Sequence, residues 1–173
     1  MKRFIPALLL LIFALVLTVQ FPAPVFAGSA EDVQAAMQLL KSKAAALGTP
    51  SLKGEEVVAG KTIPALHFGN TKMNNNFALV DDVQKEKGGT ATLFVKSGDE
   101  FVRVATNVKK DDGSRAVGTV LDPKGKAYAA IAKGESFFGE ADILGKPYVT
   151  GYEPIRDASN AVIGVYYVGY PKA

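Results

Sequence analysis

The sequence predicts an α+β domain in which one long N-terminal helix packs against a five-stranded antiparallel sheet. The first observation is an apolar period near 3.6 over residues 29–47, which is typical of an amphipathic helix. The second is a period of two in five later segments, which is typical of half-buried strands. The third is a helical segment beginning near Asp122, between the second and third of these strands. The strand segments are residues 90–96, 101–108, 136–143, 147–156 and 161–170.

The first helix has clear ends. Ser29 can cap it, and Glu31 and Asp32 lie in its first turn, where negative charge suits the helix dipole. Gly48 and Pro50 end it. Its predicted apolar face consists of Val33, Ala36, Met37, Leu40, Ala44 and Leu47.

A small extra hairpin and a short covering helix are predicted before the sheet. Residues 55–68 contain two β-like runs around a turn, and Pro64 favours an edge position because proline donates no ladder hydrogen bond. Asn76 is suited to cap a helix over residues 77–87.

The order of elements in the second half of the chain defines the main sheet. Residues 90–96 and 101–108 form the clearest hairpin. Asp122 as cap and Pro123 in the first turn predict a short crossover helix that ends at Gly134. Two strands, a helical crossover and three strands match a PAS-like antiparallel sheet. In that arrangement, the first and last of the five strands pair at the centre.

The N-terminus is predicted to be a secretory signal peptide. Lys2 and Arg3 precede an apolar run over residues 4–19, and small residues suit cleavage after Ala27. The run has about sixteen residues, fewer than the roughly 20 that span a bilayer. We therefore expect a periplasmic protein with a single domain over residues 28–173. An uncleaved segment that anchors the protein in the inner membrane is the alternative.

Composition excludes several classes of function. Once Lys2 and Arg3 are removed, 18 basic and 17 acidic residues remain, so no cationic block favours nucleic acid. The sequence contains no cysteine, which excludes disulfides and thiolate metal sites. A chain of this length suits one domain that is stabilised by its core alone.

Five stretches carry a resemblance to a known family. They are residues 63–71 (IPALHFGNT), 76–81 (NFALVD), 88–94 (GGTATLF), 101–108 (FVRVATNV), and 145–157 (GKPYVTGYEPIRD) continued by 162–170 (VIGVYYVGY). Together they resemble single Cache domains that fuse type 3 and type 2 elements. Such domains commonly form the periplasmic sensing part of methyl-accepting chemotaxis receptors and histidine kinases. The resemblance implies a PAS-like fold and the binding of a small organic ligand, for many relatives a short carboxylate.

The sequence departs from the receptor pattern at its C-terminal end. Receptors continue into a second membrane helix and a signalling module, whereas this sequence stops at Ala173. We therefore expect a stand-alone sensor module that presents its ligand to a separate membrane receptor or histidine kinase. The alternative is an interaction module without a functional pocket, soluble or anchored, that forms a homodimer through helix 29–47.

Arg103 is the first candidate for contact with a ligand. It lies in mid-strand and shares a face with Phe101 and Ala105. A guanidinium there can donate two parallel hydrogen bonds to a carboxylate. The alternatives are a solvated face or an ion pair with Glu135 or Glu153.

Four further residues are candidates for the same site. Lys146, at the turn before strand 147–156, would add a second positive charge. Tyr148 beside it, Tyr166 on the last strand and Tyr128 on the crossover helix would offer hydroxyl groups or cover the pocket. The alternatives are a solvated lysine and tyrosines that pack in the core or at an interface.

We expect no catalytic residue, cofactor or metal ion. His67 is the single histidine, whereas zinc sites need three or four ligands at regular spacing. The acidic pairs at residues 81–82 and 111–112 do not follow the spacing of a calcium loop. The sequence contains no P-loop, dinucleotide fingerprint or nucleophile elbow. These observations disfavour an enzyme.

Overall fold

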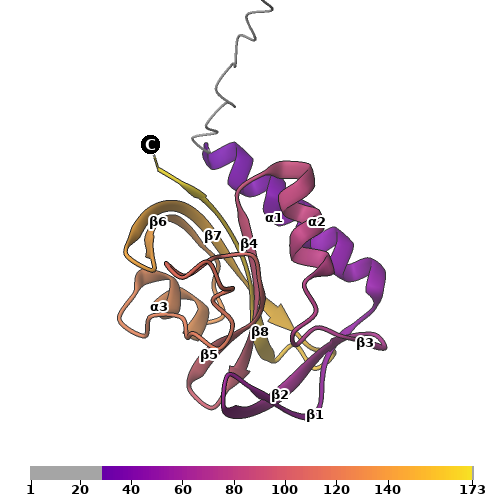
Figure 1. Cartoon of the computed structure of the whole chain (residues 1–173). Helices are drawn as coiled ribbons and strands as arrows, with labels where there is room; N and C mark the ends of the chain where they lie inside the picture. Colours follow the sequence, from indigo (N-terminus) through magenta and orange to yellow (C-terminus); the bar gives the residue numbers. More distant parts are fainter. Residues whose placement is uncertain (1–28, 173) are drawn as a thin grey trace, which may run out of the picture.

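The computed structural model describes residues 29–172, so the predicted signal peptide lies outside the described residues. Within this range, the chain forms helices and two antiparallel sheets, which confirms the α+β fold class (Figure 1). The helices are α1 (Ala30–Leu47), α2 (Ala78–Lys87) and α3 (Lys126–Ala132). The small sheet has the order β1 (Pro50–Val58), β2 (Lys61–Phe68), β3 (Thr71–Lys72). The main sheet has the order β5 (Glu100–Thr106), β4 (Thr90–Ser97), β8 (Val162–Pro171), β7 (Lys146–Arg156), β6 (Phe137–Ile143).

The first and last strands of the main sheet pair at its centre, as predicted. Thr90 lies opposite Gly169, and Val95 lies opposite Gly164, in an antiparallel register. The chain leaves the sheet at one edge, after β5, and re-enters it at the other edge, in β6. Residues 107–125, here called the β5–α3 connection, and α3 make this crossing. They therefore lie against one face of the sheet.

The alternation of side chains gives the main sheet two different faces. α1 and α2 cover one face, where Met37 and Leu40 pack in the same buried cluster as Val168. α3 and the β5–α3 connection cover the other face, where Phe94 and Tyr167 are buried. Figure 1 shows α1 and α2 on one side of the sheet and α3 on the other. Each face is thus closed by its own layer.

The predicted hairpin forms the small sheet, and Pro64 lies at a position where β2 lacks a second strand. β3 pairs only with the last two residues of β2. Beyond that point the side chain of Asn74 replaces a strand. Its Oδ1 accepts a hydrogen bond from the Leu66 N–H at 3.0 Å, and its Nδ2 donates to the Pro64 carbonyl at 3.1 Å. Proline's missing N–H therefore leaves no gap in the ladder.

The first two helices begin within one residue of the predicted positions, and the N-cap of α2 is Phe77 rather than Asn76. Ser29 and Asp32 form a reciprocal capping box at the start of α1. The Asn76 Oδ1 accepts a hydrogen bond from the N–H of Ala78, the first residue of α2, at 3.2 Å. Both helices therefore begin with side-chain acceptors for their unpaired N–H groups.

The start of the crossover helix was predicted three residues too early. Asp122 does not cap α3; its Oδ1 instead accepts a hydrogen bond from the Lys124 N–H at 3.0 Å. The Gly125 N–H donates to the Asp122 carbonyl at 3.0 Å, which closes a turn. An Asp side chain that bonds two residues ahead favours a turn over a helix, and α3 therefore begins at Lys126.

Candidate functional site

A cavity of about 450 Å³ lies between the β5–α3 connection, α3 and the edge of the main sheet. Its two buried polar side chains, Arg103 of β5 and Tyr152 of β7, are here called its inner end. The remaining lining residues come from two segments of the chain. The β5–α3 connection and α3 contribute Val120, Leu121, Asp122, Lys124, Gly125, Lys126 and Ala127. The segment of β6 and the turn after it contributes Phe137, Glu140, Ala141, Asp142, Ile143 and Leu144. Cavities of this size hold small organic ligands.

Arg103 is buried at the inner end of this cavity. Only 4% of its surface is exposed. Its guanidinium carbon lies 4.9 Å from the centre of the Phe94 ring, which faces it from the neighbouring strand. A cation over an aromatic face is stabilised by the ring quadrupole. The solvated position considered for Arg103 is therefore excluded.

The guanidinium of Arg103 has no acidic partner among residues 29–172. Its Nη1 donates to the Thr119 Oγ1 at 2.7 Å, and its buried Nε has no hydrogen-bond partner in this part of the chain. Glu153, one of the two partners considered, pairs with Lys41. Burial lowers the pKa of Arg103, which shows that its environment disfavours the charge. A buried cation without a counter-ion is costly.

The β5–α3 connection holds Arg103 in place by pairing with β5. The Arg103 N–H donates to the Thr119 carbonyl, and the Gly118 N–H donates to the Arg103 carbonyl, both at 2.9 Å. The Thr119 hydroxyl that receives Arg103 donates in turn to the Ala116 carbonyl at 2.8 Å. Thr119 is thus fixed from both sides and orients the guanidinium.

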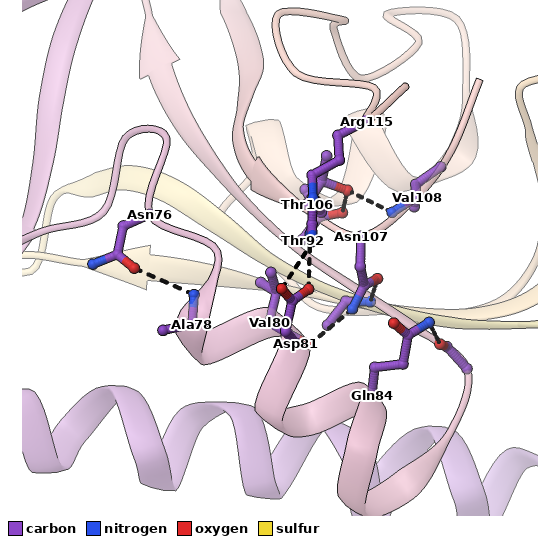
Figure 2. Close-up of polar contacts among 12 residues, drawn as sticks. Asn76, Ala78, Val80, Asp81, Gln84, Thr92, Thr106, Asn107, Val108 and Arg115 are labelled. Carbon is purple, nitrogen blue, oxygen red and sulfur yellow. Dashed lines mark hydrogen bonds and ion pairs between the residues drawn. The ribbon is translucent and has the colours of Figure 1, made fainter. Parts of the chain in front are cut away.

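An ion pair fixes the β5–α3 connection at a second position, Arg115 (Figure 2). Nη1 and Nη2 of Arg115 donate to Oδ1 and Oδ2 of Asp81, on α2, at 2.7 and 2.8 Å. Nη1 of Arg115 also donates to the Thr106 carbonyl at 2.8 Å. The bidentate geometry adds directional constraint to charge attraction. The connection is therefore tied to the helix layer on the opposite face of the sheet.

The buried side chain of Asn107 also links the β5–α3 connection to α2 (Figure 2). Asn107 accepts a hydrogen bond from the Ala91 N–H and donates one to the Val80 carbonyl, both at 2.8 Å. The hydroxyl groups of Thr92 and Thr106 lie 2.6 Å apart beside it. Buried polar groups that are fully paired specify one arrangement of the chain. They hold the start of the connection in a defined place.

Tyr152 adds a second polar group at the inner end of the cavity. Tyr152 is 1% exposed, and the centre of its ring lies 4.9 Å from the centre of the Tyr167 ring. Burial raises the pKa of Tyr152 to about 12, against the opposing effect of Arg103. The phenol is therefore protonated near neutral pH and can donate a hydrogen bond. Tyr152 was not among the candidates predicted from the sequence, although strand alternation places it on the same face as Tyr148.

The rim of the cavity carries charges of both signs. Lys124 and Lys126 are exposed, as are three carboxylates. Glu140 pairs with Lys172 at 2.6 Å. Asp142 accepts a hydrogen bond from the backbone in the following turn. Neither rim lysine was among the candidates predicted from the sequence, although both flank Gly125, the residue before α3.

The structure does not bring Lys146 or Tyr148 into this cavity. Lys146 is exposed, and its Nζ lies 3.8 Å from the Asp111 Oδ1. Tyr148 is half-buried and packs against the core beneath α3, where burial raises its pKa. The same strand, β7, lines the cavity only farther along, at Tyr152.

Tyr128 and Tyr166 also lie elsewhere. The Tyr128 hydroxyl donates to the Asp99 carbonyl at 2.7 Å, and its ring lines a separate cavity of about 370 Å³. Tyr166 faces the α1 side of the sheet, and its ring stacks on Phe68 at 6.0 Å. Arg103 is therefore the one member of the predicted set that lines the cavity.

Other groups of the described chain give little sign of chemistry. The Nδ1 of His67 lies 3.1 Å from the Ala65 carbonyl in β2. Within residues 29–172, no three His, Asp or Glu side chains gather as a metal site would require. Over the same residues, no helix combines the length and apolar character needed to cross a membrane.

Comparison with known proteins agrees with the resemblance seen in the sequence. The family model of the Cache 3/Cache 2 fusion domain matches residues 28–173. No match was found among curated proteins. The matched family consists of sensor domains, which are generally extracellular, bind ligands and do not catalyse reactions.

Proposed function

The chain belongs to the Cache 3/Cache 2 fusion domain family, and on this premise we propose that it binds a small organic anion whose carboxylate contacts Arg103. The observation that carries the proposal is the buried guanidinium, which lines a cavity and has no acidic partner among residues 29–172. A ligand carboxylate would supply the missing counter-charge and so remove an energetic penalty of the free protein.

The hydrogen bonds of Arg103 favour one mode of binding. Nη1 is engaged by Thr119 and Nε is enclosed by the protein, so Nη2 is the guanidinium nitrogen left for a ligand. A carboxylate accepts a charge-assisted hydrogen bond from such a group. The protonated hydroxyl of Tyr152 lines the same end of the cavity and supplies a further donor.

Ligand-dependent stabilisation of the purified protein tests the proposal. A carboxylate that binds the native state raises its stability, by about 2.7 kcal/mol when its concentration is 100 times Kd. A thermal-shift screen of small carboxylates should therefore reveal binders. Arg103→Met, which keeps most of the volume and removes the charge, should lose the shift. Arg103→Lys serves as the control that keeps the charge. A shift that persists unchanged in Arg103→Met would remove the guanidinium from the site.

The place of action forms a second part of the proposal. We propose that the protein is exported, that its signal peptide is cleaved after Ala27, and that the domain presents its ligand to a membrane receptor or histidine kinase in the periplasm. The generally extracellular position of the family supports this. N-terminal sequencing of the protein from a periplasmic extract should begin at Gly28. An intact N-terminus in the membrane fraction would instead favour the anchored form.

A further inference from the structure

We infer that the ligand is a monocarboxylate with an apolar body, rather than a dicarboxylate or a very short acid. This inference rests on the proposed function and concerns the same cavity. It follows from the distribution of charge and apolar surface along the cavity, from its closed inner end to its exposed rim.

The inner end of the cavity can neutralise a single negative charge. Among its charged lining residues, Arg103 alone is buried, and the others belong to the exposed rim. A second carboxylate inside would meet no further cation. Since an unpaired buried charge is strongly disfavoured, only one carboxylate is accommodated there.

The walls between the inner end and the rim are apolar. Ala127 and Ile143 are buried there, and the ring of Phe137 closes one side. Val120, Leu121 and Ala141 complete this part of the lining. Contact with such walls strengthens binding by about fourfold for each buried methylene. An apolar body therefore gains affinity in the region directly beyond the carboxylate.

The rim offers little to a second carboxylate. Lys124 and Lys126 are offset by Asp122 and Asp142, while Glu140 is paired with Lys172. All five charged residues of the rim are exposed, so water and salt weaken their effect on a ligand. A terminal carboxylate would thus exchange full hydration for a mixed and screened environment.

The volume of the cavity sets the size of the body. A cavity of about 450 Å³ is large for an acetate ion, which would leave much of the apolar wall in contact with water. An acid with a longer apolar chain would cover more of the walls and still reach Arg103.

Matched acids test the inference by isothermal titration calorimetry on the purified protein. Acetate, butanoate and hexanoate form a series of increasing length, and adipate is hexanoate with a second carboxylate at the far end. Affinity should rise about fourfold per methylene along the series, and adipate should bind at least tenfold more weakly than hexanoate. Hexanamide, which has no charge, should not bind. An equal or stronger affinity for adipate, or a flat series, would overturn the inference.

The outcomes separate this inference from the proposed function. If adipate or succinate binds best and Arg103→Met abolishes that binding, the carboxylate site stands and the monocarboxylate inference fails. If no acid binds in a manner that depends on Arg103, the proposed function itself fails. Binding of hexanoate that survives in Arg103→Met would indicate an apolar contact elsewhere and would contradict both.

A change in one wall provides a second test. Ala141→Leu narrows the apolar part of the cavity, so hexanoate should bind at least tenfold more weakly while acetate changes less than twofold. Ala129→Leu, an exposed position of α3 outside the cavity lining, is the matched control and should change neither. Circular dichroism and thermal unfolding establish that both variants fold. Equal loss of both acids, or no loss of hexanoate, would contradict a body seated against this wall.

Discussion

Replacement of Arg103 by methionine should stabilise the ligand-free protein while it abolishes binding. Most substitutions at a residue that is 4% exposed destabilise a fold. Here the buried group is a cation whose only hydrogen bond from the guanidinium goes to a threonine, and no carboxylate of residues 29–172 pairs with it. The free protein therefore carries a cost that only a ligand can remove.

The expected gain follows from three opposing effects. Methionine relieves the desolvation of the guanidinium, which costs several kcal/mol for a buried ion. It forfeits a charged hydrogen bond worth about 1.5–3 kcal/mol and a cation–π contact worth up to about 2 kcal/mol. Thr119 is not left unpaired, because its hydroxyl still donates to Ala116. We expect a net increase of about 1–3 kcal/mol in the free energy of unfolding, within the range seen when buried ionic groups are replaced by apolar ones.

Urea denaturation and thermal unfolding of both proteins measure this difference. Each kcal/mol raises the Tm of a domain of this size by about 2–4 °C, so the Tm of Arg103→Met should rise by about 2–12 °C. Arg115→Met is the matched control, since its guanidinium is paired with Asp81, and it should lower stability by about 1–2 kcal/mol. A loss of stability in Arg103→Met similar to that in Arg115→Met would refute the reasoning, because the cation would then be stabilised by the protein itself.

Three further predictions concern the supports of the site and the first helix. Asn107→Ala leaves a buried N–H and a buried carbonyl unpaired and should lower the free energy of unfolding by about 2–4 kcal/mol in urea; a change below 1 kcal/mol would show that water replaces the amide. Gly118→Val forces a side chain onto Ala59 at a positive φ of 82° and should cost about 1–3 kcal/mol by the same assay; an unchanged midpoint would mean that the small-sheet hairpin yields without cost. Hydrogen bonds from Ser29 lower the pKa of Asp32 from 3.8 in the folded protein. The stabilisation that this carboxylate contributes is therefore present above the unfolded pKa and is lost as the pH falls through the lower folded pKa. Asp32→Asn should therefore flatten the loss of stability as the pH falls below 3.8, and parallel curves for both proteins would contradict this.

Much of the fold was predictable because its signals are local. The period of 3.6 before Gly48 and the period of two in each strand follow directly from helix and strand geometry. Alternation also places Arg103 on the same face as Phe101, although a solvated position for that face was still open. Capping at Ser29 depends on residues three positions apart.

The rest of the site depends on contacts between distant segments. The β5–α3 connection has no hydrophobic period, so its pairing with β5, and with it the role of Thr119, could not be inferred. Alternation gives Tyr166 and Tyr170 the same face of β8. It does not indicate on which side of the sheet the cavity lies. Lys146 was chosen for its charge near a turn, and the direction of that turn carries it to the surface.

The central claim is that a ligand carboxylate binds the guanidinium of Arg103 inside the cavity. The most direct measurement is a titration of the arginine Nε–H resonances with hexanoate by ¹H–¹⁵N NMR, with Arg103 assigned from the spectrum of Arg103→Lys. Arg115 and Arg156 are internal controls, because each donates to other groups of the chain. We predict a saturable shift of the Arg103 resonance at the concentrations that bind by calorimetry, with the other two unchanged. Binding by calorimetry without any shift of Arg103 would contradict the claim.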